Sequence, residues 1–188
     1  MSSVNIVVGL SGVGKSTVLE KATDKSDKEY EVINYGDRMV ETAKDRGLVD
    51  HRDEMKDLDV ETYKDIQKKA AESIVEDSED GNVIVDTHAA IKSPFGYIPG
   101  LPKWTVENLM PDKLVMLTAD SEAIFERSQE GGRDREHDSP EDIEEYQEVA
   151  REMAATGSVL TGAYLQVIEN EEGKADEAAE KLVETLEA

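Results

Sequence analysis

The chain has 188 residues, 44 of them acidic and 21 basic, which gives a formal net charge of −23 at pH 7. So negative a chain is not expected to bind nucleic acid or anionic membranes, which select basic surfaces, and its length predicts one domain. The absence of cysteine excludes disulfides and thiolate metal sites, and the lack of a signal peptide or long apolar run predicts a cytoplasmic protein.

The first predicted elements enclose a glycine-rich loop. Val4–Val8 is an apolar run that predicts a strand, and a helix is expected from Thr17 to about Lys25. Between them, Gly9–Ser16 (GLSGVGKS) matches the phosphate-binding pattern G-x-x-x-x-G-K-[ST] at every fixed position. Glycines let successive backbone N–H groups converge on one anion, and the following helix adds the positive end of its dipole. The stretch therefore predicts a nucleotide-binding loop rather than a plain strand-to-helix turn.

A carboxylate is expected beside this loop. Val83–Val85 predicts a buried strand, and Asp86 follows it at the end where ligands bind in an open α/β sheet. Lys15 would reach the β- and γ-phosphates, while the Ser16 hydroxyl and Asp86, the latter through water, would hold Mg²⁺. The alternative for Asp86 is a capping role in a turn. The three histidines show no ligand spacing, so a metal role for His88 is not favoured.

Strand-like and helix-like segments alternate along the rest of the chain. The remaining strands are predicted at Tyr30–Tyr35, Leu114–Leu117 and Tyr164–Ile168. Further helices are expected to open at Gly36–Asp37, at Asp59 and at Ser139–Pro140, and a last helix carries Ala178, Leu182, Val183 and Leu186. Alternation of this kind gives a parallel sheet with helices on both faces. The expected fold class is a three-layer α/β sandwich with a five-stranded parallel sheet.

Three of the seven arginines lie within nine residues: Arg127, Arg133 and Arg135. They flank a charged, glycine-bearing stretch, and residues 128–138 are interpreted as a short mobile lid. Arginine stays charged and binds phosphate oxygens through a fork of donors, so such a lid would close over a transferring phosphoryl group. The alternative is a solvated loop whose arginines pair with the neighbouring acids Glu126, Glu130, Asp134 and Glu136.

Three classes of protein fit a loop of this type: a small phosphotransferase, a nucleotide-dependent switch, and a nucleotide-binding module without turnover. A guanine-nucleotide switch is expected to contain D-x-x-G and N-K-x-D, and neither string occurs in the sequence. The arginine cluster favours the phosphotransferase. A small-molecule kinase with another acceptor and a regulatory module both stay open at this point.

Longer stretches resemble one family. VINYGDRM, HRDEMKDL and VDTHAAIKSPFGYIPGLP, together with the phosphate loop, look like the archaeal-type adenylate kinases. The similarity runs from Val4 past Gly162 and is most specific from Asp86 to Pro102, which generic phosphate-loop kinases do not share. The resemblance implies the reaction ATP + AMP ⇌ 2 ADP with Mg²⁺, and an adenylate-kinase-like phosphate-loop fold. It also implies a cytoplasmic location and an assembly that is often a homotrimer.

The resemblance also implies roles for particular residues. The ATP phosphates would be bound by Gly9, Leu10, Ser11, Gly12, Val13, Gly14, Lys15, Ser16 and Thr17. Arg38 would bind the phosphate of AMP, and Lys92 would be another cation on the AMP side, although some relatives have arginine in its place. Four arginines would serve the transferring group, the first three by closing over the ATP phosphates: Arg127, Arg133, Arg135 and Arg151. The lid segment has no cysteine, so no zinc is expected.

The charge of −23 also bears on the salt concentration in which the protein works. An acidic surface of this kind suits concentrated salt, because net charge bears on solubility rather than on fold. We therefore expect a halophilic protein; the alternative is an acidic protein from an ordinary cell. Its few cations would be concentrated where two polyanionic nucleotides meet, since these repel one another and the protein unless their charge is neutralised.

Overall fold

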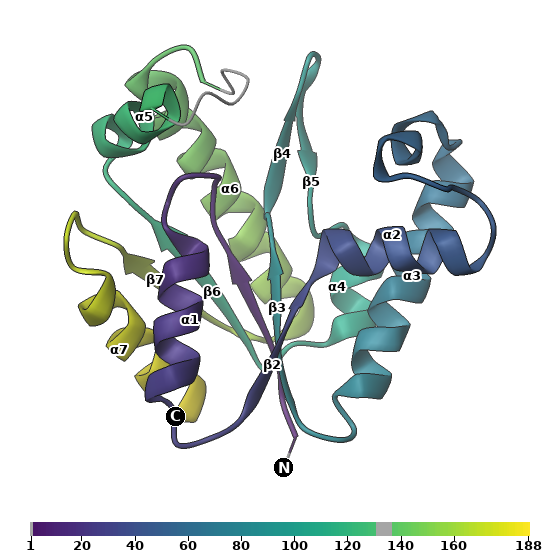
Figure 1. Cartoon of the computed structure of the whole chain (residues 1–188), viewed down its shortest axis with the longest axis horizontal. Helices are drawn as coiled ribbons and strands as arrows, with labels where there is room; N and C mark the ends of the chain where they lie inside the picture. The colour runs from purple at the N-terminus through teal and green to yellow at the C-terminus, as the bar shows by residue number, and fades with distance from the viewer. Residues whose placement is uncertain (1, 131–136) are drawn as a thin grey trace.

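Five parallel strands form the centre of the molecule. The computed structural model describes residues 2–130 and 137–188. The strands are β1 (Val4–Val8), β2 (Tyr30–Asn34), β3 (Asn82–Thr87), β6 (Lys113–Thr118) and β7 (Tyr164–Glu169), in the order β2-β3-β1-β6-β7 (Figure 1). Each neighbouring pair is parallel. The five-stranded parallel sheet predicted from the sequence is confirmed.

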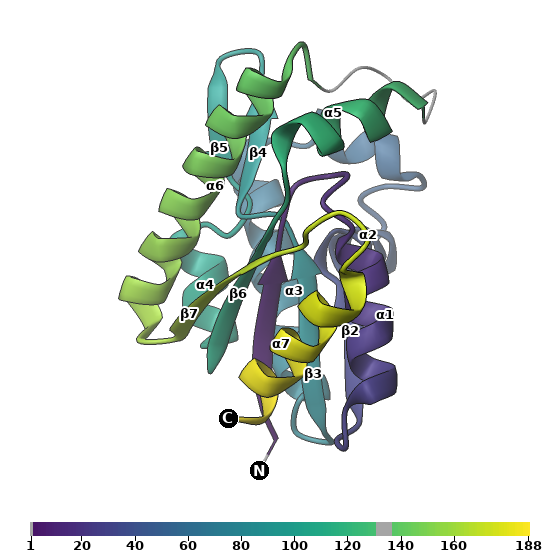
Figure 2. The ribbon, with the colours of Figure 1, turned by 90° about the vertical axis from the view of Figure 1, so that its left-hand side faces the viewer.

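Two layers of helices cover the sheet. On one face, α1 (Lys15–Lys25) packs against α7 (Ala175–Glu187). On the other face lie α3 (Val60–Asp77), α4 (Lys103–Leu109) and α6 (Pro140–Thr161). Figure 2 shows the layers from the side, with α1 and α7 on one side of the strands and α4 and α6 on the other. None of the described helices combines the length and the apolar character that a membrane span requires.

Smaller elements surround the carboxyl ends of the strands. α2 (Tyr35–Asp45) follows β2 directly and packs on α3, and the short 3₁₀ helix η1 (Arg52–Asp57) follows α2. β4 (Ala90–Ser93) and β5 (Gly96–Pro99) form an antiparallel hairpin, and α5 (Ser121–Glu130) packs on α6. In Figure 1 the hairpin, α5 and η1 all stand at the same end of the sheet. Ligands of open α/β sheets bind at this end, beside the strand where the chain order reverses.

The core follows the predicted apolar runs. β1 is buried at all five positions, and every residue of Val83–Val85 and Leu114–Leu117 is at most 1% exposed. Because parallel strands are covered on both faces, they contain consecutive apolar residues rather than an alternation. Helix faces are buried too: Ile66, Ala70 and Ile74 on α3, and Ala178, Leu182 and Leu186, which were predicted to share a helix, on α7.

The predicted boundary between the second strand and its helix is wrong by one residue. The strand ends at Asn34, whose side-chain oxygen accepts a hydrogen bond from the Asp37 N–H at 3.0 Å and so caps α2. Tyr35 is therefore helical. Its buried hydroxyl donates to the Gln67 carbonyl at 2.8 Å, a contact with α3 that local sequence does not reveal. The first helix also begins earlier than expected, at Lys15.

The segment interpreted as a mobile lid begins as a helix. Residues 128–130 are the last residues of α5, so Gln129 and Glu130 are helical rather than part of a loop. Residues 131–136 lie outside the described part of the chain. His137 is buried, and Ser139 caps α6 as predicted, its hydroxyl accepting from the Asp142 N–H at 3.3 Å.

Candidate active site

The phosphate loop joins the end of β1 to the start of α1. Gly12 has a φ of +88° and Gly14 a φ of +84°, both in the left-handed region that favours glycine. Gly14 immediately precedes the first turn of α1. Among the described residues, no side chain caps this helix start. The N–H groups of the first turn are therefore available to an anion.

Asn170, which follows β7, packs under this loop. Its Nδ2 donates to the Val13 carbonyl at 2.8 Å, and the residue is 5% exposed. A Cβ at Gly14 would lie 2.5 Å from the same nitrogen, so the close approach requires glycine. Sequence reasoning missed Asn170 because its partner is 157 residues away in the chain.

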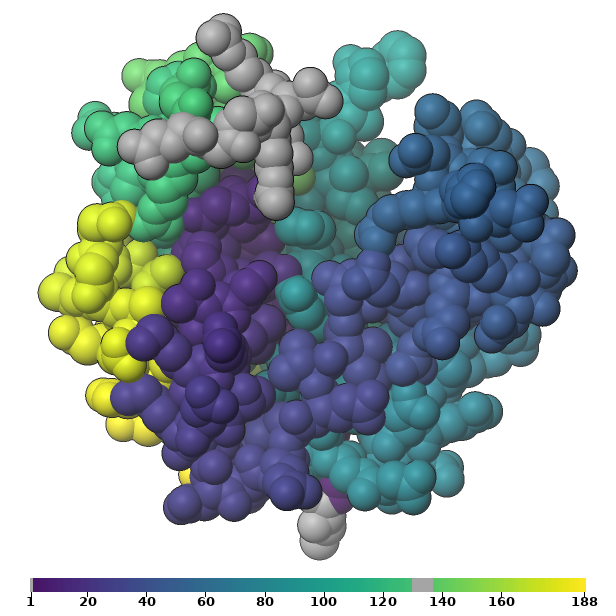
Figure 3. Space-filling model, in the orientation of Figure 1, coloured from purple at the N-terminus to yellow at the C-terminus, as the bar shows by residue number. Residues whose placement is uncertain are grey.

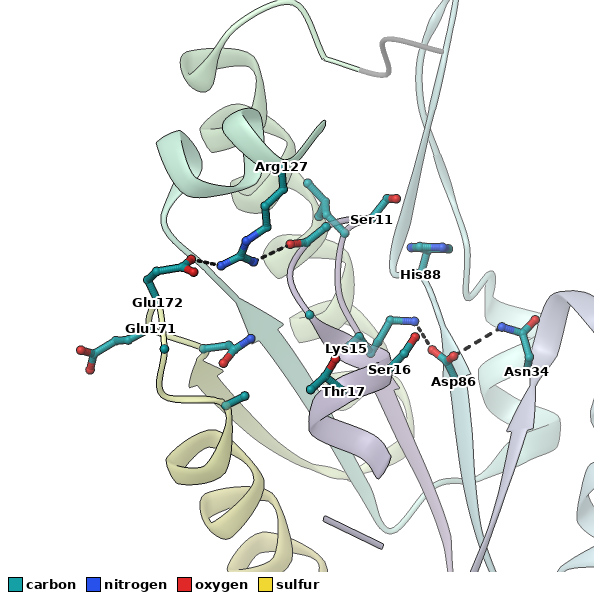
Figure 4. A pocket seen from close by; sticks show the side chains of 16 residues that line it. Ser11, Lys15, Ser16, Thr17, Asn34, Asp86, His88, Arg127, Glu171 and Glu172 are labelled. Carbon is teal, nitrogen blue, oxygen red and sulfur yellow. Dashed lines mark hydrogen bonds and ion pairs between the residues drawn. The ribbon is translucent and has the colours of Figure 1, made fainter. Parts of the chain in front are cut away.

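Lys15 and Asp86 form an ion pair in front of the loop. The Lys15 Nζ contacts the Asp86 Oδ1, and the two side chains are only 10% and 15% exposed. The Nδ2 of Asn34 donates to the other carboxylate oxygen at 3.4 Å, so the three side chains form a line (Figure 4). The strand register places these residues side by side. Asn34 on β2 is aligned with Asp86 on β3, and Asp86 is aligned with Val7 on β1, the strand that leads into the phosphate loop. Asn34 was not predicted as a site residue, although asparagine before a helix is a capping signal.

These residues line a cavity of about 600 Å³, within the range of ligand sites in proteins. One wall is the phosphate loop and the first turn of α1. The facing wall contains Asn34, Asp86 and His88. The Nδ1 of His88 lies 2.8 Å from the Gly9 carbonyl oxygen, which ties the end of β3 to the loop. The remaining wall is formed by Arg127 and the segment after β7.

Oxygen donors suited to Mg²⁺ lie in this cavity. Ser16 belongs to the first turn of α1 and lines the same cavity as Asp86. Mg²⁺ is usually bound by one or two carboxylates together with waters and substrate phosphates. A hydroxyl and a carboxylate on one cavity that also has a phosphate loop therefore fit the predicted ion.

Arg127 closes the cavity on the α5 side. Its Nη1 donates to the Gly12 carbonyl at 2.9 Å, and its Nη2 pairs with the Glu172 carboxylate (Figure 4). Among the described residues Arg127 thus pairs with an acid 45 residues along the chain rather than with Glu126 or Glu130. The other two arginines of the cluster, Arg133 and Arg135, lie outside the described residues.

A second cavity, of about 500 Å³, adjoins the first. Ser11 and His88 line both cavities, and Lys92 and Tyr146 belong to the second. The Lys92 ammonium pairs with Asp142 on α6. This hydrogen bond raises the pKa of Lys92 and lowers that of Asp142, so both are charged at neutral pH. The predicted AMP-side lysine thus lies next to the phosphate loop.

Two predicted site residues lie apart from these cavities. Arg38 on α2 donates to the Ser73 hydroxyl at 3.0 Å and to the Asp77 carboxylate at 2.6 Å, so its head group lies against α3. It lines a separate surface hollow. Arg151 is an exposed residue of α6 and is not among the residues lining either cavity.

Comparisons with known proteins agree with this geometry. A family model described as an AAA domain matches residues 8–144. An adenylate kinase of Methanocaldococcus jannaschii is 42% identical over 189 residues, covering 98% of each chain. One of Methanopyrus kandleri is 42% identical over 99% of this chain and 98% of its own. Among solved structures, shikimate kinase from Bacteroides thetaiotaomicron superposes with a TM-score of 0.61 at 14% identity, over 100% of both chains, a likeness of fold alone.

Proposed function

The chain belongs to the adenylate kinase family, and from that membership we propose which of its residues bind each nucleotide. It is a phosphotransferase that interconverts ATP and AMP with two molecules of ADP. The observation that carries this conclusion is the phosphate loop, faced by Asp86 within one cavity, in a chain similar to adenylate kinases over nearly its whole length.

The donor, ATP, binds along the phosphate loop. The N–H groups from Gly9 to Thr17 surround its phosphates, as the free helix start and the two left-handed glycines support. Lys15 leaves Asp86 and contacts the β- and γ-phosphates, since a phosphate chain offers it more charge than one carboxylate. Arg127 lies at the rim of this site and would contact the donor from the α5 side.

Mg²⁺ would be held by Ser16 and, through water, by Asp86. When bound, the ion neutralises phosphate charge and orients the phosphate chain. Asp86 is available for this role once Lys15 has moved to the phosphates. Asn34, which donates to the second oxygen of Asp86, keeps the carboxylate oriented toward the cavity.

The acceptor, AMP, enters from the second cavity. Lys92 would bind its phosphate, and the cavity that Lys92 shares with Ser11 of the phosphate loop supports this. A phosphate oxygen of AMP attacks the γ-phosphorus of ATP, and the bond from that phosphorus to the β–γ bridging oxygen breaks. For Arg38 the family resemblance implies a contact with the same phosphate, which would require its guanidinium to leave Ser73 and Asp77.

The remaining arginines would neutralise charge on the transferring group. Arg133 and Arg135 would do so from the lid segment and Arg151 from α6, since each such contact can be worth roughly 10³–10⁵ in rate. Closure of the lid would exclude water and so prevent hydrolysis of ATP. The trimeric assembly and the cytoplasmic location implied by the resemblance stay predictions.

The reaction can be tested with one substrate. Purified protein incubated with ADP and Mg²⁺ alone should form ATP and AMP in equal amounts, because one ADP donates its β-phosphoryl group to another. Nucleotides are separated by anion-exchange chromatography, with EDTA in a parallel sample as the control. Formation of AMP and inorganic phosphate without ATP would instead identify a hydrolase and overturn the assignment.

A further inference from the structure

The acceptor side of the main cavity has to receive an anion. Its wall from β2 and β3 presents Asn34, Asp86 and His88, and the lysine that pairs with Asp86 comes from the phosphate loop. Once Lys15 turns to ATP, the phosphates of ATP and the incoming AMP phosphate share this cavity with Asp86, and like charges repel. A cation from the acceptor side would offset this repulsion.

Arg52, the first residue of η1, lies at the edge of this wall. Its Nη1 pairs with the Asp37 carboxylate in the first turn of α2. Its Nη2 lies over Gly36, where an added Cβ would be 2.8 Å from that nitrogen and 3.3 Å from the Asn34 Oδ1. Asn34 itself lines the cavity. The guanidinium is thus held next to a residue of the cavity wall, in space left by a glycine.

A series of contacts connects this arginine with the phosphate loop. Lys15 pairs with Asp86, Asp86 accepts from Asn34 at 3.4 Å, Asn34 accepts from the Asp37 N–H at 3.0 Å, and Asp37 pairs with Arg52. In the space-filling view, α2 and η1 (blue) form a lobe that stands apart from the phosphate loop (purple) across a hollow (Figure 3). The lobe therefore brings a guanidinium to the side of the cleft opposite the donor site.

We propose that Arg52 binds the phosphate of the acceptor nucleotide, an inference that rests on the proposed adenylate kinase reaction. The Arg52 side chain is 61% exposed, and a guanidinium has five N–H donors, so donors remain for phosphate oxygens while one contacts Asp37. Arginine suits the role because its fork binds two phosphate oxygens at once. Asp37 positions the fork, and Gly36 leaves the approach to it open.

Arg38 provides a matched comparison. It also belongs to this lobe, yet its side chain is only 17% exposed and its donors contact Ser73, Asp77 and Glu41. Arg52 can meet a phosphate without giving up its position, whereas Arg38 would first have to break its bonds to α3. The structure thus favours Arg52 over the arginine that the family resemblance suggested.

The test compares Arg52→Gln, Arg52→Lys and Arg38→Gln with the wild type. Arg52→Gln should raise the KM for AMP at least tenfold and leave the KM for ATP within about twofold, because only the acceptor phosphate loses a partner. Arg52→Lys should recover part of the loss, since it restores the charge but not the fork. Calorimetric titration should show weaker binding of AMP but unchanged binding of adenosine, which has no phosphate.

Several results would count against a role of Arg52 in binding the AMP phosphate. An unchanged KM for AMP in Arg52→Gln overturns it, as does an equal rise of the KM values for both substrates or an equal loss of adenosine binding. A rise caused by Arg38→Gln alone would assign the phosphate to Arg38 instead. If the wild type forms no ATP from ADP, the proposed reaction itself fails; if it does and only the Arg52 result is negative, the reaction stands without this contact.

Discussion

Lys15→Ala is expected to lower kcat by at least two orders of magnitude while the protein stays folded. The lysine contacts phosphate oxygens whose charge changes during transfer, so its loss removes stabilisation of the transition state. Removing one such donor from a preorganised site typically costs about 10²–10³ in kcat. The melting temperature should move by no more than about 4 °C, about 1 kcal/mol for a chain of this length. Initial rates at saturating ATP, AMP and Mg²⁺ provide the measurement.

Lys21→Ala is the matched control. Lys21 lies on the same helix but pairs with Asp176 at the surface, and its side chain is 37% exposed. Exposed ion pairs contribute little, so this variant should keep both its rate and its melting temperature. A Lys15→Ala variant that keeps more than about a tenth of the wild-type turnover, a loss under about 1.4 kcal/mol, would contradict the role of the lysine.

A double variant tests whether the loss of rate comes from the unpaired Asp86 carboxylate. In Lys15→Ala the Asp86 carboxylate stays in a cavity that must accept phosphates, and its repulsion could by itself lower the rate. Lys15→Ala/Asp86→Asn removes that charge and leaves the cavity shape nearly unchanged. Turnover should stay low in the double variant, which lacks both the lysine and the carboxylate proposed to hold Mg²⁺. Recovery to above a tenth of wild type would mean that the unpaired carboxylate, rather than the missing lysine, caused the loss.

Much of the sheet and half of the main cavity could be predicted from local sequence. Val83–Val85 and Leu114–Leu117 are continuous apolar runs because both faces of a parallel strand are buried. Such a run can be recognised from a few consecutive residues. The phosphate loop is equally local, since its glycine φ values and its lysine lie within one short segment. Asp86 could be placed because strand ends meet at one edge of the sheet.

The other half depends on contacts between distant segments. Arg127 binds a carboxylate 45 residues away, and Asn170 a carbonyl 157 residues away, so nothing near either residue marks its partner. The β4–β5 hairpin was missed for another reason: Ile91 is 40% and Ile98 52% exposed, so it has no fully buried face to produce a strand pattern. Arg38 matched a family pattern in sequence, but its ion pair with Asp77 turns it toward α3.

The charge of −23 leads to the other large expected effect, a protein that is more stable in concentrated salt. Even if each of the 21 basic residues paired with one of the 44 acids, 23 carboxylates would remain without a basic partner. At about 0.1 M salt the Debye length is about 10 Å, so neighbouring carboxylates repel; at about 1 M it is about 3 Å. Exposed ion pairs such as Lys21–Asp176 are screened too, but they contribute little at the start.

From this balance we expect the melting temperature to rise by at least about 5 °C between about 0.1 M and 2 M KCl, at about 2–4 °C per kcal/mol for this chain length. The rate at subsaturating ATP should rise as well, because the long-range field that opposes an anion is screened. The Lys15–Asp86 pair is largely buried and should be affected much less. A melting series without nucleotide, run beside initial-rate measurements, tests both expectations. A melting temperature that stays flat or falls would remove the proposal of a high-salt protein and leave the kinase assignment intact.

The control for screening is a variant with fewer charges. Glu144, Glu148 and Glu152 are exposed and spaced four residues apart on α6, where like charges repel. The variant with all three changed to glutamine should melt higher than the wild type at about 0.1 M KCl, and the difference should shrink at about 2 M. A salt that is excluded from protein surfaces also strengthens apolar burial, whatever the charge of the protein. If stronger apolar burial were the whole effect, the melting temperatures of the wild type and the variant would rise equally with salt. The explanation by charge repulsion would then be wrong.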